Sequence, residues 1–114
     1  MSNLDAILNR HVAAFNAKDP AEFMADFAPD AIVELANGRV LQGAEAIRAY
    51  FARAFALDPT VRLEIVSRKG EGLQREVSWV SKKGRRTIAH GSEIYLFGPE
   101  GRIQAKRTLR LGRL

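Results

Sequence analysis

Hydrophobic residues near the N-terminus recur with the period of an amphipathic helix. They occupy positions i, i+3, i+4, i+7 and i+11 and so form one stripe of a 3.6-residue repeat: Leu4, Ile7, Leu8, His11 and Phe15. Ser2 and Asp5 are typical of a helix N-terminus, where a carboxylate is favoured in the first turn. The pattern therefore predicts a first helix whose buried side includes a histidine.

A second, short helix is predicted directly after the first. Asp19 precedes Pro20, and Glu22 stands three residues after Asp19, which is typical of a capped helix start. Phe23, Met24 and Phe27 supply its apolar side, and Pro29-Asp30 is expected to end it.

Residues 31–42 predict two short strands, 31–35 and 40–42, joined by a tight turn at Asn37-Gly38. Gly43 then opens a third helix, which Asp58-Pro59 ends. The apolar residues of this helix repeat at helical spacing: Ile47, Tyr50, Phe51, Ala54 and Phe55.

From residue 61 onwards the apolar positions alternate, which is typical of strands. Strands are expected at 61–65, 77–83, 86–97 and 103–111, with glycine-containing turns between them. Helices followed by an antiparallel meander predict an α+β fold. No repeat or linker interrupts the pattern, so residues 1–114 are expected to form one domain.

Composition excludes several classes of function. The chain has no cysteine, which excludes disulfides and thiolate metal sites and fits a cytoplasmic location. No apolar run is long enough to span a bilayer. The net charge of +5 would suit an anionic partner such as nucleic acid. However, the basic pairs at 68–69, 82–83, 85–86 and 106–107 lie mostly at predicted hairpin ends without interleaved aromatics, so nucleic-acid binding ranks lowest.

Several stretches together carry a family resemblance. HVAAFNAKD (11–19), FAPDAIVE (27–34) and GAEAIRAYF (43–51) resemble the front half of bacterial ketosteroid isomerases and SnoaL-like proteins of the nuclear-transport-factor-2-like superfamily. GRRT (84–87), EIYLF (93–97) and GRI (101–103) fit the back half. The resemblance implies a cone-shaped, cystatin-like fold in which a curved, mainly antiparallel (mixed) sheet wraps three N-terminal helices. It also implies a pocket between the helices and the sheet, and a homodimer through the outer sheet face.

The functional positions of the isomerases carry over only in part. The position of their base, an aspartate, falls at Leu35, which cannot accept a proton. The tyrosine that donates a hydrogen bond to the dienolate oxygen falls at His11, and the protonated aspartate that assists it falls at Glu93. The resemblance therefore implies polar pocket groups at 11 and 93 but not steroid isomerisation by the family mechanism.

His11 and Glu93 each have a structural and a functional interpretation. A histidine on an apolar helix face is either a buried, hydrogen-bonded core residue or a titratable donor or general base. Glu93 shares a strand face with Tyr95 and Phe97, where desolvation disfavours its ionised form unless a cation compensates. It is either a paired structural glutamate or a catalytic acid or base.

The last strand offers such cations on its polar face, which carries Gln104, Lys106, Thr108 and Arg110. By the resemblance this face looks into the cavity, so that Lys106 or Arg110 would pair with Glu93 or bind an anionic ligand group. Otherwise these cations are simply solvated. Trp79 is expected in the core or at the dimer face, and Glu76 is either solvent-exposed or a second pocket carboxylate.

The resulting prediction is a small-molecule-binding SnoaL-like protein. It would act as an isomerase, cyclase or hydratase on an apolar, carbonyl-bearing ligand, with His11 and Glu93 as catalytic groups and no cofactor. Ligand-binding positions are expected at Phe15, Leu35, Phe51, Tyr95, Phe97, Lys106 and Arg110. The two histidines lack metal-ligand spacing, so no metal site is expected. The alternative, which Leu35 favours, is a non-catalytic binding or dimerisation module.

Overall fold

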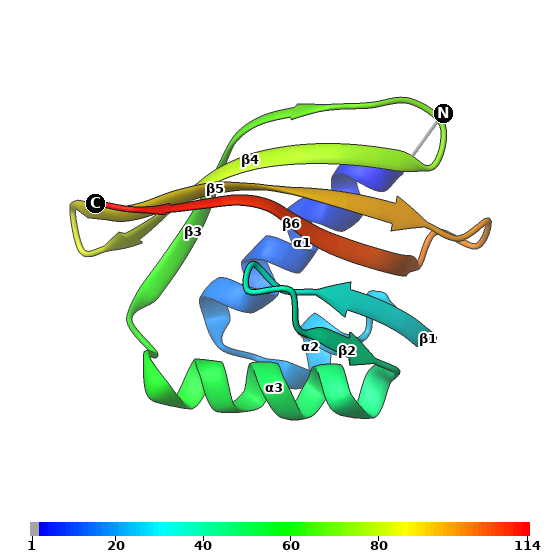
Figure 1. The fold of residues 1–114 in the computed structure, drawn as a ribbon, viewed down its shortest axis with the longest axis horizontal. Helices are drawn as coiled ribbons and strands as arrows, with labels where there is room; N and C mark the ends of the chain where they lie inside the picture. The colour runs from blue at the N-terminus through cyan, green and yellow to red at the C-terminus, as the bar shows by residue number, and fades with distance from the viewer. Residues whose placement is uncertain (1–2) are drawn as a thin grey trace.

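The computed structural model describes residues 3–114 and has the predicted α+β order. The helices are α1 (Leu4–Ala17), α2 (Pro20–Met24) and α3 (Ala44–Leu57). The strands are β1 (Phe27–Glu34), β2 (Val40–Gln42), β3 (Val61–Lys69), β4 (Gln74–Lys83), β5 (Arg86–Phe97) and β6 (Ile103–Arg113) (Figure 1). The predicted contribution of Ser2 to the first helix lies outside the described residues. No helix within 3–114 is both long and apolar enough to cross a membrane.

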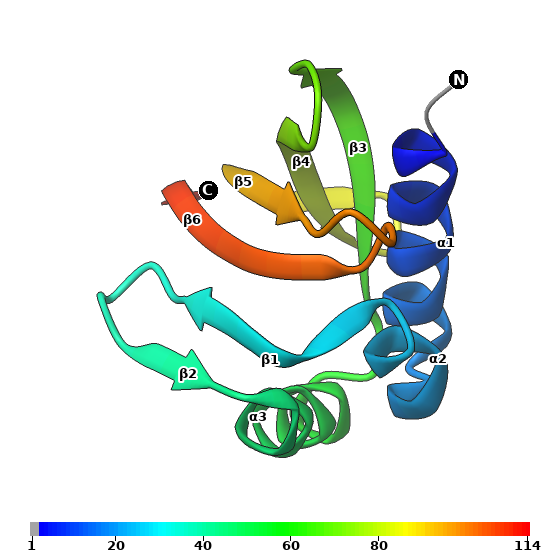
Figure 2. The same ribbon diagram turned by 90° about the vertical axis from the view of Figure 1, so that its right-hand side faces the viewer.

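One six-stranded sheet has the order β2-β1-β6-β5-β4-β3. All neighbours are antiparallel except β1 and β6, which run parallel, so the sheet is mixed as predicted. The sheet curves strongly, and α1 and α3 close its open side (Figure 2). This arrangement confirms the expected cone and encloses the core between the helices and the concave sheet face.

The predicted end of the second helix is wrong. α2 ends at Met24, and Phe27 already begins β1. Phe27 pairs with Ile103 of β6 in the parallel ladder, and the register shifts between Phe27 and Ile32. Pro29 lies within this interruption, where its missing N–H removes no regular ladder bond. The predicted cap is confirmed, because the Asp19 side chain accepts a hydrogen bond from the backbone N–H of Glu22 (3.1 Å).

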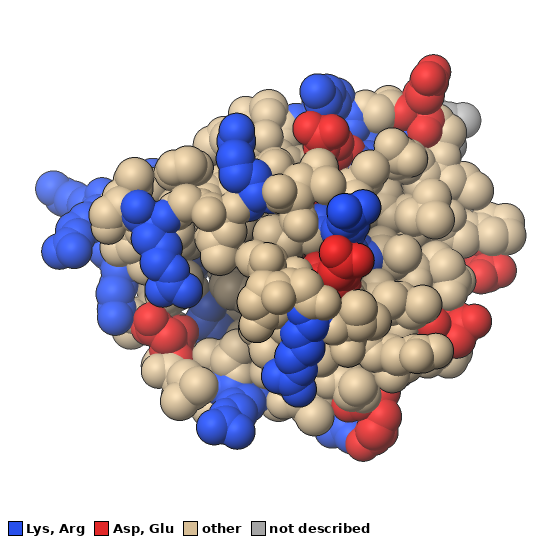
Figure 3. All heavy atoms as spheres, viewed as in Figure 1, with Lys and Arg blue, Asp and Glu red and all other residues tan. Residues whose placement is uncertain are grey.

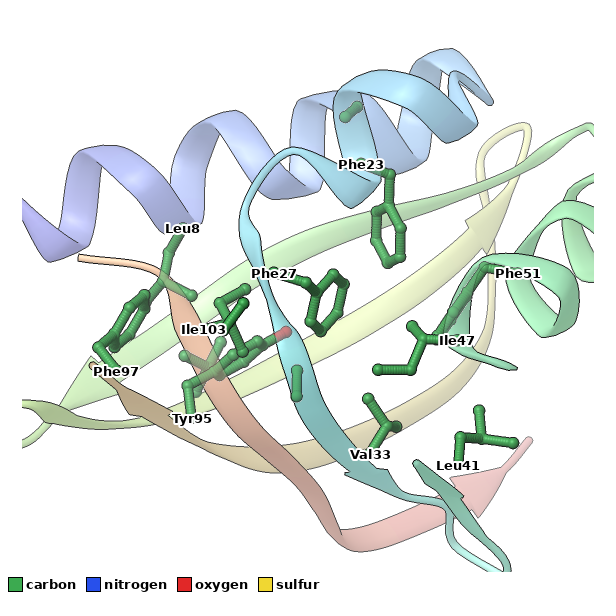
Figure 4. Close-up of a cluster of buried hydrophobic side chains, with 14 of the residues drawn as sticks. Leu8, Phe23, Phe27, Val33, Leu41, Ile47, Phe51, Tyr95, Phe97 and Ile103 are labelled. Carbon is green, nitrogen blue, oxygen red and sulfur yellow. The ribbon is translucent and has the colours of Figure 1, made fainter. Parts of the chain in front are cut away.

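Phe23 reaches from α2 into the cluster of buried core side chains (Figure 4). Only 1% of Phe23 is exposed, and its ring lies 4.7 Å from that of Phe51 and 5.6 Å from that of Phe27, measured between centroids. The α2 segment is only five residues long, so its stability comes from this packing rather than from helix propensity. Phe23 thereby fixes the position of the residues that follow it, including Asp26.

Trp79 lies directly opposite Gly91 in the pairing of β4 with β5. A Cβ atom added at Gly91 would lie 2.5 Å from Cζ2 of Trp79 and 2.6 Å from the carbonyl oxygen of Arg110. Glycine within a strand often marks such a close approach. The absence of a side chain at Gly91 therefore lets the indole lie across β5 on the concave face.

Replacing Gly91 with alanine should lower the free energy of unfolding by about 1–3 kcal/mol, since the new methyl group would overlap the indole and a backbone carbonyl. Urea unfolding monitored by circular dichroism measures this change. Gly98→Ala is the matched control. Its new Cβ would lie 3.2 Å from the flexible Glu100 side chain and at ordinary contact distance from Gln104 and the Arg102 carbonyl, so the expected change is within about 0.5 kcal/mol. Equal effects of the two substitutions would contradict the proposed close packing.

Candidate functional site

A cavity of about 180 Å³ lies between the helices and the concave face of the sheet. In the orientation of Figure 1, the surface is visibly hollowed where the sheet ends lie over α3, and several Lys and Arg side chains and an acidic side chain lie around this hollow (Figure 3). The lining is mainly apolar and aromatic, with a few polar groups: His11, Val12, Phe15, Phe23, Val33, Leu35, Tyr50, Phe51, Leu63, Trp79, Glu93, Tyr95, Lys106 and Thr108. An apolar cavity with few polar groups is typical of small-molecule sites.

His11 reaches the cavity from the apolar face of α1, as its helical spacing predicts. The residue is 1% exposed, and its ring stacks on Phe23 with centroids 4.1 Å apart. Its Nδ1 atom lies 3.2 Å from Oδ2 of Asp26. The residues between α2 and β1 therefore supply a carboxylate to a histidine of α1.

Asp26 is fixed by several partners. Its side chain is fully buried and forms an ion pair with Arg10, whose Nε lies 3.2 Å from Oδ1. Its backbone carbonyl accepts a hydrogen bond from the N–H of Ile103 (2.7 Å). Burial by itself would raise the pKa of Asp26, but the hydrogen bonds from His11 and Arg10 outweigh burial and hold this pKa below its usual value. Asp26 is therefore an ionised acceptor at neutral pH.

The charge of Asp26 decides the tautomer of His11. A carboxylate only accepts hydrogen bonds, so Nδ1 of the imidazole carries the proton and donates a hydrogen bond to Asp26. Nε2 is then an acceptor. It is buried and has no hydrogen-bond partner among residues 3–114. The cavity is thus lined by a neutral histidine with a free lone pair, whereas the family resemblance implied a hydrogen-bond donor at this position.

Burial keeps this histidine neutral. Desolvation, reinforced by the positive charge of Lys106, lowers the pKa of His11 from 6.5 to about 4. The Asp26 carboxylate and the backbone carbonyl of Phe23 act in the opposite direction but do not compensate. At neutral pH, His11 is therefore an unprotonated base that is difficult to protonate.

Glu93 and Lys106 form the polar group on the sheet side. Lys106 Nζ lies 3.7 Å from Oε2 of Glu93, and both side chains are almost buried. Glu93 also accepts hydrogen bonds from the hydroxyls of Tyr95 (3.3 Å) and Thr108 (3.4 Å). The structure thus shows Glu93 as a paired glutamate, and the pairing with Lys106 that the sequence suggested is present.

Three aromatic rings surround the Lys106 ammonium. Its Nζ lies 5.1 Å from the ring centroid of Phe51, 5.5 Å from that of Tyr95 and 5.6 Å from that of Phe23. Ring faces attract cations, so they and Glu93 hold a positive charge at the cavity wall. Burial, followed by the Glu93 charge, raises the pKa of Tyr95 well above its usual value, and its hydroxyl remains a donor.

The other predicted ligand-binding residues divide into two groups. Phe15, Leu35 and Phe51 line the cavity. Phe97 is buried in the core beyond the cavity lining, and Arg110 lies in a separate shallow groove beside Ala36 and Asn37.

The position of Arg110 corrects the expectation that the whole polar face of the last strand looks inward. The pairing of β5 with β6 shifts register between Ser92 and Glu93, so Arg110 pairs with Ser92 and is exposed, while Thr108 pairs with Glu93 inside. Glu76 also faces outward, where it forms an ion pair with Lys69 (3.6 Å). The alternation of polar and apolar residues does not reveal a β-bulge, which reverses the faces of the strand that follows it.

Sequence reasoning missed Asp26 and assigned Trp79 to the core or a dimer face. Asp26 had one signal, a single acidic residue between Phe23 and Phe27 in an otherwise apolar segment. Trp79 instead lines the cavity.

Residues 8–105 match the SnoaL-like domain family. The chain belongs to the SnoaL-like family. A cystatin-fold protein from Novosphingobium aromaticivorans is 24% identical and superimposes with a TM-score of 0.81, covering 96% of this chain and 99% of that one. A protein from Agrobacterium tumefaciens assigned as an isomerase of the SnoaL-like family is 20% identical. It superimposes with a TM-score of 0.80, covering 95% of this chain and 97% of that one. A Sinorhizobium meliloti protein assigned as a polyketide cyclase is 21% identical and superimposes with a TM-score of 0.78, covering 95% of this chain and 99% of that one. At these identities the SnoaL-like neighbours establish the fold alone.

The buried histidine should make stability depend on pH. His11 has a pKa of about 4 when folded and 6.5 as its ordinary value, so between these values the unfolded chain binds more protons. The free energy of unfolding should therefore fall as the pH drops from about 6.5 to 4, by ~3 kcal/mol in total. Urea unfolding at several pH values measures the slope.

His11→Phe should remove this slope, because no imidazole then remains to be protonated in the core. The other histidine, His90, lies on the convex face. His90→Gln should therefore retain the pH-dependent slope. A slope that survives His11→Phe would show that another group is responsible.

Proposed function

We propose that the cavity binds a small apolar molecule bearing a carbonyl group and that His11 acts as a general base on it, in an isomerase- or cyclase-type proton transfer. The observation that carries this proposal is the unpaired, buried Nε2 of a histidine whose other nitrogen is held by Asp26. An imidazole oriented by a carboxylate is a common arrangement for general-base catalysis.

The proposed reaction separates charge across the cavity. Nε2 of His11 takes a proton from the ligand, and the electron pair left behind moves onto the carbonyl oxygen as an enolate. Asp26 stabilises the imidazolium that forms, while the Lys106 ammonium is the cation available to the enolate oxygen. Return of the proton to a different ligand atom completes an isomerisation without any cofactor.

The low pKa of His11 is compatible with this role. The imidazolium is disfavoured there mainly because burial removes water, and next because Lys106 is positive. A ligand oxygen that becomes negative beside Lys106 would offset both effects, since an opposite charge favours the protonated imidazole. Protonation of His11 is thereby coupled to formation of the enolate.

This proposal assigns new positions to the catalytic groups. Leu35, which stands where the isomerases have their base, lines the cavity as an apolar residue. The base would come instead from α1. Glu93 would act chiefly through Lys106, which it pairs with and orients, and not as a proton carrier.

The second candidate is a non-catalytic binding or homodimerisation module of the same fold. One observation favours it. Ile32, Ala105 and Leu96 lie side by side on the convex sheet face, and Leu96 and Ile32 are 47% and 41% exposed. An exposed apolar line on a sheet suits contact with a second copy, and a dimer is compatible with either candidate.

Deuterium exchange distinguishes the two candidates. Small enones and ketones incubated with the protein in D₂O should exchange their α-protons faster than in buffer, as followed by NMR. His11→Phe should reduce the protein-dependent rate by a factor of about 10²–10⁴, the usual contribution of a general base. His90→Gln is the matched control and should leave the rate unchanged. Binding without exchange would support the non-catalytic alternative. Protein-dependent exchange that His11→Phe leaves intact would show that His11 is not the base.

A further inference from the structure

Trp79, which lines the cavity, carries a second buried polar atom without a partner, its indole N–H. Trp79 is the single tryptophan of the chain, and it lies on the concave face of β4 across from Gly91. Its Nε1 atom is buried and has no hydrogen-bond partner among the described residues. Buried N–H groups are nearly always paired, so an unpaired one that lines a cavity points to a partner on the ligand.

Within residues 3–114, His11 Nε2 and Trp79 Nε1 are the two buried side-chain polar atoms that lack a partner. Both residues line the same cavity, His11 from α1 and Trp79 from β4. The two atoms are of opposite kind, because the first is an acceptor and the second can only donate. A ligand that paired only with His11 and Lys106 would leave the indole N–H unsatisfied.

The location of Trp79 on the cavity wall indicates which part of a ligand its indole N–H could reach. Trp79 and Leu63 line both this cavity and an adjoining apolar groove formed with Val61, Ile88 and Leu111. The cavity, at about 180 Å³, is close to the size of a cavity of about 150 Å³ that holds one benzene ring. Trp79 therefore lies on the wall that is shared by a space for one ring and the neighbouring groove.

We infer that Trp79 is a specificity-determining residue that donates its indole N–H to a second oxygen of the ligand, separate from the carbonyl oxygen near Lys106. The ligand class is a compound about one ring in size with two oxygen functions at different positions on an apolar frame. This inference rests on the proposed function, since it takes the cavity to be the ligand site. Beyond that function, it specifies that the ligand has two oxygen functions and that Trp79 selects the second one.

Matched aromatic ketones test the inference. The probes are 2-, 3- and 4-methoxyacetophenone, each compared with the ethylacetophenone of the same substitution, in which a CH₂ group replaces the ether oxygen. The three positions sample different separations between the two oxygens. Binding is followed in ¹H–¹⁵N spectra, where the single tryptophan gives one indole cross-peak and the His11 ring resonances report occupation of the cavity.

For at least one position, the methoxy probe should bind about five- to tenfold more tightly than its ethyl counterpart, the usual effect of one added hydrogen bond. It should also move the indole proton downfield, whereas the ethyl probe should not. Trp79→Phe keeps an aromatic ring but removes the N–H, and it should bring the ratio of the two affinities close to one.

Two results would overturn the inference, and they differ in what else they contradict. If the probes shift the His11 resonances but no methoxy probe gains affinity or moves the indole proton, the role of Trp79 is wrong and the proposed ligand site stands. If no probe shifts either set of resonances, the cavity does not take aromatic ketones, and the proposed function fails as well. The wild-type indole signal decides the question even if Trp79→Phe is unstable.

Discussion

The Asp26 carboxylate lies fully buried where α1, the end of α2 and the start of β1 meet, and it accepts hydrogen bonds from both Arg10 and His11. The backbone carbonyl of the same residue binds the N–H of Ile103 at the start of β6. A buried charge is tolerated only when it is paired and hydrogen-bonded in this way. The fold and the candidate site therefore depend on the same residue. Asp26 connects the first helix to the parallel strand pair, and it also determines which nitrogen of His11 is left without a partner.

The two walls of the cavity have complementary chemistry. The helical wall presents a neutral imidazole with a free lone pair, and the sheet wall presents the Lys106 ammonium, held by Glu93 and three aromatic rings. Each wall also influences the other, because the charge of Lys106 helps to keep His11 unprotonated. An anionic oxygen arriving between them would relieve that repulsion. The site is thus arranged to respond to negative charge on a ligand.

Much of the fold could be predicted from the sequence because the local signals agreed. The helical stripe containing Leu8 and His11, the Asp19 cap and the alternation around Trp79 each correspond to an observed element. The end of α2 could not be predicted, since Phe27 joins β1 through pairing with the distant Ile103.

The candidate site was predictable only where one helix face or one strand face decided the orientation. His11, Glu93 and Lys106 meet that condition and line the cavity. Arg110 does not, because a register shift in β6 turns it outward. The partnership of Asp26 with His11 brings together residues 15 apart through the packing of α2, which no local pattern encodes.

The protonation state of His11 decides whether the cavity contains a base. Long-range ¹H–¹⁵N spectra of the imidazole, recorded from pH 7 down to pH 4, distinguish the two neutral tautomers from the imidazolium. We expect a neutral ring with the proton on Nδ1 across most of this range, with protonation only near pH 4. A proton on Nε2, or an imidazolium at pH 7, would contradict this expectation, because the cavity would then contain a donor and no base.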